Sequence, residues 1–195
     1  MKTTNEKTAL VLIEFQNEWL SEQGILHQKL VTDKSQLSAA HRGGKQWLAR
    51  ARKEGMHVVH VLMRPDENYQ IFGEAHLGLR AAIPAVGSWK QQMADIHPDF
   101  RPLPREHVIR ERVGASAFAG SNLDAYLRNN RISTMILCGF ATHVCVESTL
   151  REAHDKGYDT YVAKDAVAAF NQEQQSFFFS QVVHHFGDVI SLSRS

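Results

Sequence analysis

Cys145 stands where a thiol can be activated. It closes the run 139–145 (GFATHVC), which follows an apolar stretch, 134–138 (TMILC), and precedes a stretch with helical character, 146–154 (VESTLREAH). This order predicts that Cys145 lies at the first turn of a helix, just beyond the carboxyl end of a buried strand, where open α/β sheets bind their ligands. Free N–H groups and the positive end of the helix dipole favour a thiolate there. Position alone leaves two interpretations open, a nucleophile and a small buried core residue.

Two charged residues are predicted at the same edge of the sheet. Glu14 interrupts the apolar run 8–15 (TALVLIEF) near its end, where an unpaired buried charge would be costly. Arg112 follows the stretch 107–110, which reads as a strand, and can supply the opposite charge. The two residues therefore form either a plain ion pair at a strand end or the charged part of a reactive site.

Two other kinds of site have weaker support. No glycine-rich fingerprint follows the first strand, where 14–19 reads EFQNEW, so a nicotinamide or flavin dehydrogenase is disfavoured. Among the eleven histidines, His57 and His60 point to opposite faces of a strand. His76 and His97 lie in a long loop, which leaves a His/Asp metal site open beside the simpler interpretation of solvated loop histidines. The nearest acidic residues in the sequence are Asp66, Asp95 and Asp99.

Short apolar runs alternate with longer helical stretches along the chain. The predicted strands are 8–15, 57–63, 107–110, 132–138, 158–163 and an edge strand, 188–192; the other main helices are 35–54, 122–130 and 172–186. This alternation predicts an α/β fold with three layers, αβα, around a mostly parallel sheet of five to six strands, as in Rossmann-like topologies. The stretch 64–105 carries all five prolines and no clear period, so it is either functional or contains short elements.

Composition narrows the class of protein. A chain of 195 residues predicts one domain, 1–195. The net charge of +1 gives no basic field for nucleic acid or anionic lipid, and no apolar run approaches the length of a membrane span. The polar N-terminus lacks the pattern of a secretory signal. Two cysteines form neither a disulfide scaffold nor a zinc motif, which favours a reducing cytoplasm.

Three co-linear segments resemble a known family. Residues 116–168 match the patterns S-A-F-x-G-T-x-L, G-x-x-T-x-x-C-V-x-x-T and G-Y-x-V-x-x-x-x-D-A, and the first strand, VLIEFQNEWL, is similar to one leading into D-x-Q-x-x-F. These patterns resemble the isochorismatase-like cysteine hydrolases, which include nicotinamidases, N-carbamoylsarcosine amidases and ureidoacrylate amidases. The resemblance covers nearly the whole chain and implies the isochorismatase-like fold.

The resemblance also implies roles for individual residues. Family members carry an Asp–Lys–Cys triad, whose positions here hold Glu14, Arg112 and Cys145. It implies attack of Cys145 on an amide, ureido or carbamoyl carbon, with Glu14 carrying the proton and Arg112 giving electrostatic support. A cis peptide is expected at Phe140–Ala141, and the backbone N–H groups of Ala141 and Cys145 would form the oxyanion hole. The chain would thus be an amidase-like hydrolase.

Further expectations concern metals, substrate contacts and assembly. The metal-binding pattern of nicotinamidases is missing from 64–69 (RPDENY), so no catalytic metal and no cofactor are expected. Positions close to the acid, the Arg112 loop and the nucleophile, together with the long loop, predict a set of substrate-binding residues, for which a place in the core stays open as the alternative: Phe15, Gln16, Trp19, Trp89, Phe118 and His143. Family members are often dimers or tetramers, and Phe177–Phe179 is consistent with a face that meets a partner subunit. Two alternatives to a hydrolase stay open: a catalytically degenerate small-molecule-binding protein and a redox sensor based on Cys145.

Overall fold

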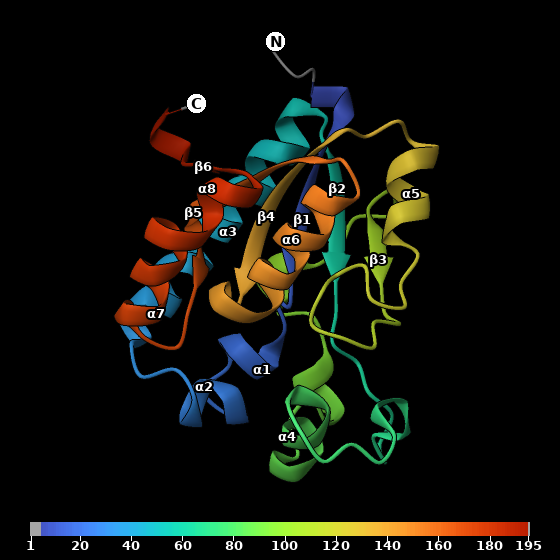
Figure 1. Ribbon diagram of the computed structural model, residues 1–195, viewed down its shortest axis with the longest axis vertical. Coiled ribbons are helices and arrows are strands. Elements are labelled where there is room, and N and C mark those ends of the chain that lie inside the picture. Colours follow the sequence, from blue (N-terminus) through green and yellow to red (C-terminus); the bar gives the residue numbers. More distant parts are fainter. Residues whose placement is uncertain (1–4, 195) are drawn as a thin grey trace.

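A six-stranded parallel sheet forms the centre of the molecule. The computed structural model describes residues 5–194, and the strand order is β3-β2-β1-β4-β5-β6, with every neighbouring pair parallel (Figure 1). The strands are β1 (Thr8–Ile13), β2 (His57–Val61), β3 (His107–Ile109), β4 (Thr134–Phe140), β5 (Asp159–Ala168) and β6 (Asp188–Ile190). The predicted α/β class and parallel sheet are confirmed.

Strand register brings the reactive candidates to one edge of this sheet. Ile13, the last residue of β1, pairs with Val61 of β2 and with Gly139 of β4. Gly139 has a φ of 129°, and a Cβ there would lie 1.9 Å from the carbonyl oxygen of Ile13. Glycine therefore lets the two central strands approach at the point where both end.

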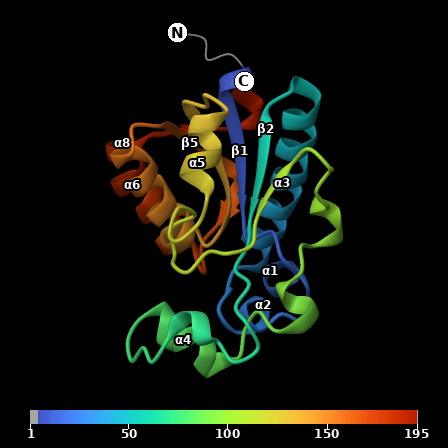
Figure 2. The same ribbon diagram turned by 90° about the vertical axis from the view of Figure 1, so that its right-hand side faces the viewer.

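Helices cover both faces of the sheet. In Figure 2 the long helix α3 lies on one side of the strands, and α5, α6 and α8 lie on the other. The α-helices are α1 (Asn17–Leu20), α2 (Ile25–Lys29), α3 (Lys34–Glu54), α4 (Leu79–Val86), α5 (Leu123–Asn129), α6 (Glu147–Asp155), α7 (Gln172–Phe177) and α8 (Val183–Phe186). This arrangement is the predicted three-layer αβα architecture.

Local chemistry explains the length and close packing of α3. Asp33 caps its N-terminus by accepting the Gln36 N–H at 3.1 Å, and Gly55 ends it in the left-handed conformation. At Gly43 and Gly44 a Cβ would meet the Asp165 carbonyl and the ring of Phe15, so these glycines allow α3 to lie directly on the sheet.

The proline-rich stretch 64–105 contains α4 and short turns rather than one open loop. Its 3₁₀ turns are η2 (Gln70–Phe72), η3 (Gln91–Ala94) and η4 (Pro98–Phe100). Two further 3₁₀ turns, η1 (Asn5–Lys7) and η7 (Leu192–Arg194), lie near the ends of the described chain. In Figure 1, α1, α2 and α4 lie beyond the carboxyl ends of the strands, on the same side of the molecule as the start of α6.

Two helical segments contain π-helical turns. Turn η5 (Thr142–Val146) leads into α6, and turn η6 (Phe178–Val182) separates α7 from α8. The predicted single helix over 172–186 is therefore interrupted at its aromatic run, where Phe178 is fully buried while Phe177 is 61% exposed. No helix of residues 5–194 is both long and apolar enough to cross a membrane.

Candidate active site

Glu14 is a carboxylate buried at the end of β1. Its side chain is inaccessible to solvent, and its backbone has a φ of 59°, which is uncommon for a residue other than glycine. The Glu14 N–H donates to the Val61 carbonyl at 2.8 Å, so this backbone conformation is held by the neighbouring strand β2. A charge so completely removed from water needs close partners.

Arg112 supplies the opposite charge from the segment after β3. Its guanidinium is buried; one terminal nitrogen pairs with Glu14 Oε1 and the other donates to the Ala115 carbonyl at 2.9 Å. Burial opposes the charged form, but the Glu14 carboxylate and Cys145 outweigh it and raise the pKa of Arg112 above its usual value. Arg112 is therefore a permanent cation in this site.

Trp19 holds the second oxygen of the carboxylate. Its indole Nε1 donates to Glu14 Oε2 at 2.8 Å, and its ring packs on Phe140 and Phe170. Position 19 is where the family pattern quoted above has phenylalanine, which offers no N–H. The longer acid Glu14 and the donor Trp19 therefore fit one another.

Cys145 completes the group. It is a free, buried cysteine in η5, and the side chains of Glu14 and Arg112 both act on the pKa of its thiol. Burial and the Glu14 carboxylate raise the pKa of the thiol well above its usual value, and Arg112 offsets part of that rise. The resting group is thus a neutral thiol facing a carboxylate, which corrects the expectation of a thiolate stabilised by the helix start: desolvation outweighs the dipole at this depth.

The backbone before Cys145 has an unusual conformation. The Phe140–Ala141 peptide bond is cis, as the resemblance implied. Within residues 5–194, the Ala141 N–H donates to no backbone carbonyl, while its C=O accepts from Val144 and Val146. An N–H group is thus available one helical turn before the thiol.

A small apolar cavity lies beside Glu14, Arg112 and Cys145. It has a volume of about 140 Å³, and Glu14, Ala141 and Cys145 lie in its wall. Apolar and aromatic side chains form most of its surface: Trp19, Ile25, Leu26, Leu30, Met63, Leu79, Ala82, Ile83, Val86, Trp89, Val144 and Phe170. Besides Glu14, the charged residue lining it is Lys29, which is exposed.

The predicted substrate-binding residues divide into two groups. Trp19 and Trp89 line the cavity. Phe15 is buried against Phe100 and Phe140, and Phe118 stacks on Tyr158, so neither ring is part of the cavity wall.

Gln16 and His143 also lie outside the cavity wall. The Gln16 amide donates to the carbonyls of Met63 and Ala94 and accepts the Met63 N–H, and these bonds tie β1 to the chain that follows β2. His143 meets Phe170 edge-on with ring centroids 4.6 Å apart, and burial holds the pKa of this histidine below its usual range.

Sequence reasoning missed several cavity residues. Phe170 follows the carboxyl end of β5. The rule that ligands bind at the carboxyl ends of the strands, which identified Glu14 and Cys145, therefore applied to Phe170 as well. Ile83 and Val86 come from α4, which was not predicted because the stretch 64–105 has no clear hydrophobic period.

Elsewhere in the described chain, His41, His97 and Asp99 form the group whose ligand atoms lie close enough to hold a metal ion.

Comparisons with known proteins agree with this architecture. The model of the family described as the isochorismatase domain matches residues 8–194. An uncharacterized isochorismatase family protein, YrdC, from Bacillus subtilis is 28% identical over 69% of this chain and 64% of its own length. The ureidoacrylate amidohydrolase RutB from Cronobacter sakazakii is 29% identical over 83% of this chain and 74% of its own. An isochorismatase family protein from Burkholderia thailandensis superposes with a TM-score of 0.82 at 24% identity, covering 98% of this chain and 94% of that one.

Proposed function

Because the chain belongs to the isochorismatase family of hydrolases, we propose that it cleaves a C–N bond of a small amide, ureido or carbamoyl compound through a thioester on Cys145. The observation that carries the proposal is the meeting of Glu14, Arg112 and Cys145 beside one apolar cavity, with Glu14 and Cys145 in its wall. The similarity to ureidoacrylate amidohydrolases supports the choice of bond.

The first half of the reaction uses Glu14 as a base and then as an acid. Its carboxylate takes the Cys145 thiol proton while sulfur attacks the carbonyl carbon, giving a tetrahedral oxyanion. The C–N bond then breaks, and the same proton passes from Glu14 to the leaving nitrogen. Ammonia or an amine departs, and a thioester remains on Cys145.

The second half returns the enzyme to its starting state. Glu14 takes a proton from water as the water oxygen attacks the thioester carbon. The C–S bond breaks, the sulfur recovers a proton from Glu14, and a carboxylic or carbamic acid leaves. Arg112 stays protonated throughout, since a buried guanidinium paired with a carboxylate has no accessible neutral form.

Backbone N–H groups stabilise the oxyanion in this scheme. The N–H of Ala141, which donates to no backbone carbonyl in the described part of the chain, and the N–H of Cys145 are the donors we assign to it. Backbone donors fixed before substrate arrives stabilise a developing charge without reorganisation, which is worth about 3 kcal/mol for each donor.

The cavity indicates the class of acyl group. A dry protein cavity of ~150 Å³ holds a molecule of the size of benzene, so the portion next to the scissile carbon is small and apolar. The Lys29 ammonium offers a partner for a carboxylate at the far end of the substrate.

Ammonia release from a panel of small amides, ureido acids and carbamoyl amines tests the proposal, with intact-mass detection of an acyl adduct on the Cys145 peptide. We expect turnover in the wild type and no turnover in Cys145→Ala. Hydrolysis that persists in Cys145→Ala would falsify the mechanism.

Glu14→Gln separates proton transfer from thiol ionisation. In this variant Arg112 faces the thiol without the carboxylate, so alkylation of Cys145 at neutral pH should be maintained or faster while turnover is lost. Cys138, which is also free and buried, is the internal control for alkylation. Stoichiometric, reductant-reversible oxidation of Cys145 without turnover of any panel compound would instead favour the redox sensor.

A further inference from the structure

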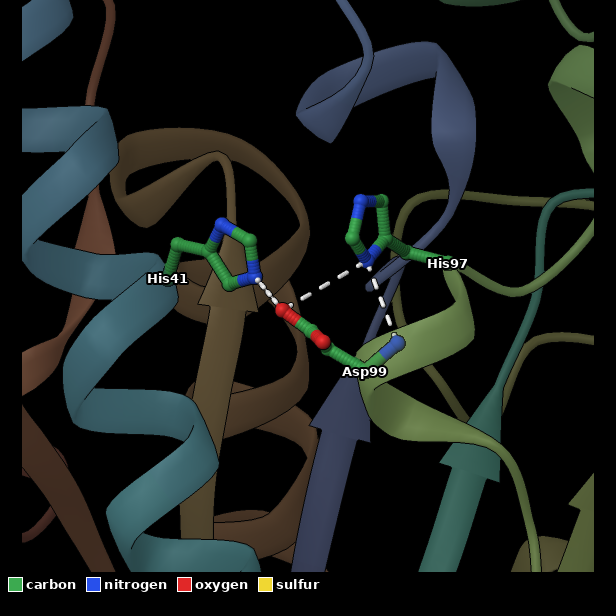
Figure 3. Close-up of side chains that lie close together, drawn as sticks. All are labelled: His41, His97 and Asp99. Carbon is green, nitrogen blue, oxygen red and sulfur yellow. Dashed lines mark hydrogen bonds and ion pairs between the residues drawn. The ribbon is translucent and has the colours of Figure 1, made fainter.

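A second group of chemically reactive side chains lies on the α3 side of the sheet. His41 comes from α3, while His97 and Asp99 come from the start of η4 (Figure 3). The nitrogen and oxygen atoms that these residues can offer to a metal all lie within 4.8 Å of one another. None of the three lines the cavity beside Cys145.

The spacing of these atoms is close to that of a coordination sphere. His41 Nε2 lies 2.8 Å from Asp99 Oδ2, and His97 Nδ1 lies 4.0 Å from the same oxygen. Tetrahedral zinc with bonds of ~2.0 Å separates its ligand atoms by about 3.3 Å, so changes of well under 1 Å at these two contacts would bring them to the spacing of a zinc site. Two imidazoles and one carboxylate are a ligand set that suits zinc and not magnesium or calcium.

The backbone beneath the group is already fixed. The His97 N–H donates to the Phe15 carbonyl at 3.0 Å, and Ile96 forms a bridge with Gln16. The fully buried Phe100 ring packs under both imidazoles, with centroid distances of 5.5 and 6.4 Å. Ordering of the ligands therefore costs little when an ion binds.

One competing cation lies at the same carboxylate. Lys45 Nζ is 3.1 Å from Asp99 Oδ2, but its side chain is 50% exposed and can turn into water. The Asp99 N–H also donates weakly to His97 Nδ1, at 3.3 Å, and would give up that contact. The side chains of His41 and His97 are about a quarter exposed, which leaves room for a water ligand.

We propose that His41, His97 and Asp99 bind one zinc-type transition-metal ion, with water in the remaining position. The ion would join the middle of α3 to the segment that hydrogen bonds to the end of β1. It is a structural site, separate from Cys145, and does not depend on the proposed hydrolysis. Zinc ions are therefore expected to raise the melting temperature of the metal-free protein.

Titration of the tag-free, chelator-treated full chain with zinc chloride tests the site by calorimetry. We expect one ion per chain, with affinity falling about tenfold or more in His41→Ala, His97→Ala and Asp99→Asn. Lys45→Ala should bind zinc more tightly, because it removes the competing cation; a group that is only a surface ion-pair cluster would give no such gain.

Matched controls separate this site from adventitious binding. His184→Ala removes an exposed histidine of α8, and Cys145→Ala removes a free thiol; both should bind zinc as the wild type does. Cobalt(II) added to the wild type should give the visible absorption of a four-coordinate ion, which needs no variant to fold. Absence of saturable binding to the wild type, or binding that survives both His41→Ala and His97→Ala, overturns the proposal.

Discussion

The two reactive groups of this protein differ most in their access to water. Glu14 and Arg112 have no exposed side-chain surface, whereas Asp99 is 36% and Lys45 50% exposed. Water reaches neither charge of the Glu14–Arg112 pair, so each charge depends on the other for its stabilisation. In the Asp99–Lys45 pair, water can replace either partner, so this ion pair stabilises the protein far less. Burial therefore restricts the first group to one arrangement, whereas the second can change partners, as the proposed zinc site requires.

The largest effect is expected from the thiol. Cys145→Ala should lower the rate of C–N hydrolysis by about three orders of magnitude or more, because it removes the thiol that the proposed mechanism uses as nucleophile. Cys138→Ala makes the same chemical change at another free, buried cysteine and should leave the rate within a small factor of wild type. Steady-state ammonia release measures both, and equal losses in the two variants would contradict the assignment of Cys145.

The second largest effect is expected when one of the two buried charges, that of Arg112, is removed. Arg112→Met leaves Glu14 unpaired and should destabilise the fold by about 3–5 kcal/mol, while Lys45→Ala at the exposed pair should cost less than about 1 kcal/mol. Urea unfolding measures both free energies. The double variant Glu14→Leu/Arg112→Met should recover much of the stability lost in Arg112→Met, and a purely additive result would show that the two charges act independently.

The reactive residues could be predicted from the sequence because a parallel sheet aligns its strand ends. Glu14 and Cys145 each follow a buried strand closely, so their meeting required only the correct strand order. The side-chain environments could not be predicted this way. The left-handed backbone at Glu14 sets which way the next residues point, and it leaves Phe15 and Gln16 in the core instead of the cavity wall.

The group of His41, His97 and Asp99 shows a different limit of prediction from the sequence. His97 and Asp99 are two residues apart, but their third partner, His41, lies 56 residues earlier along the chain on α3. No periodic pattern links a helix face to a loop at that separation. Only the packing of α3, which depends on Gly43 and Gly44, brings the three together.

A third charged group lies between the two extremes of exposure. Glu106, whose side chain is 8% exposed, contacts His60 at 2.9 Å and Arg52 at 2.7 Å. Burial alone would raise the pKa of Glu106, but hydrogen bonds from His60 and Arg52 outweigh it and lower the pKa to about 2. A lowered carboxyl pKa stabilises the fold above the unfolded value of about 4.3, and this contribution is lost as pH falls towards 2.

Glu106→Gln should therefore cost about 2 kcal/mol at pH 7, after allowance for partial solvent screening, and progressively less below pH 4. Urea unfolding of both proteins across this pH range measures the difference. Glu54→Gln, which breaks the more exposed pair with Arg50, serves as the control and should be almost neutral at every pH. A cost of Glu106→Gln that stays constant down to pH 2 would contradict the linkage.

The smallest predicted effect compares the two tryptophans of the cavity. Trp19 Nε1 donates to Glu14, while Trp89 Nε1 is buried without a hydrogen-bond partner among residues 5–194. Trp19→Phe keeps an aromatic ring but frees one oxygen of the Glu14 carboxylate. If Glu14 carries the proton as proposed, kcat should fall about tenfold with KM little changed, since a hydrogen bond to a charged group is worth about 1.5–3 kcal/mol. Trp89→Phe removes an N–H of the cavity wall that we expect to bind substrate, and should raise KM with kcat almost constant. The same effect of both substitutions on KM alone would mean that Trp19 contacts substrate and does not orient Glu14. The opposite result, a loss of kcat in both, would place the Trp89 N–H at the reacting atoms as well.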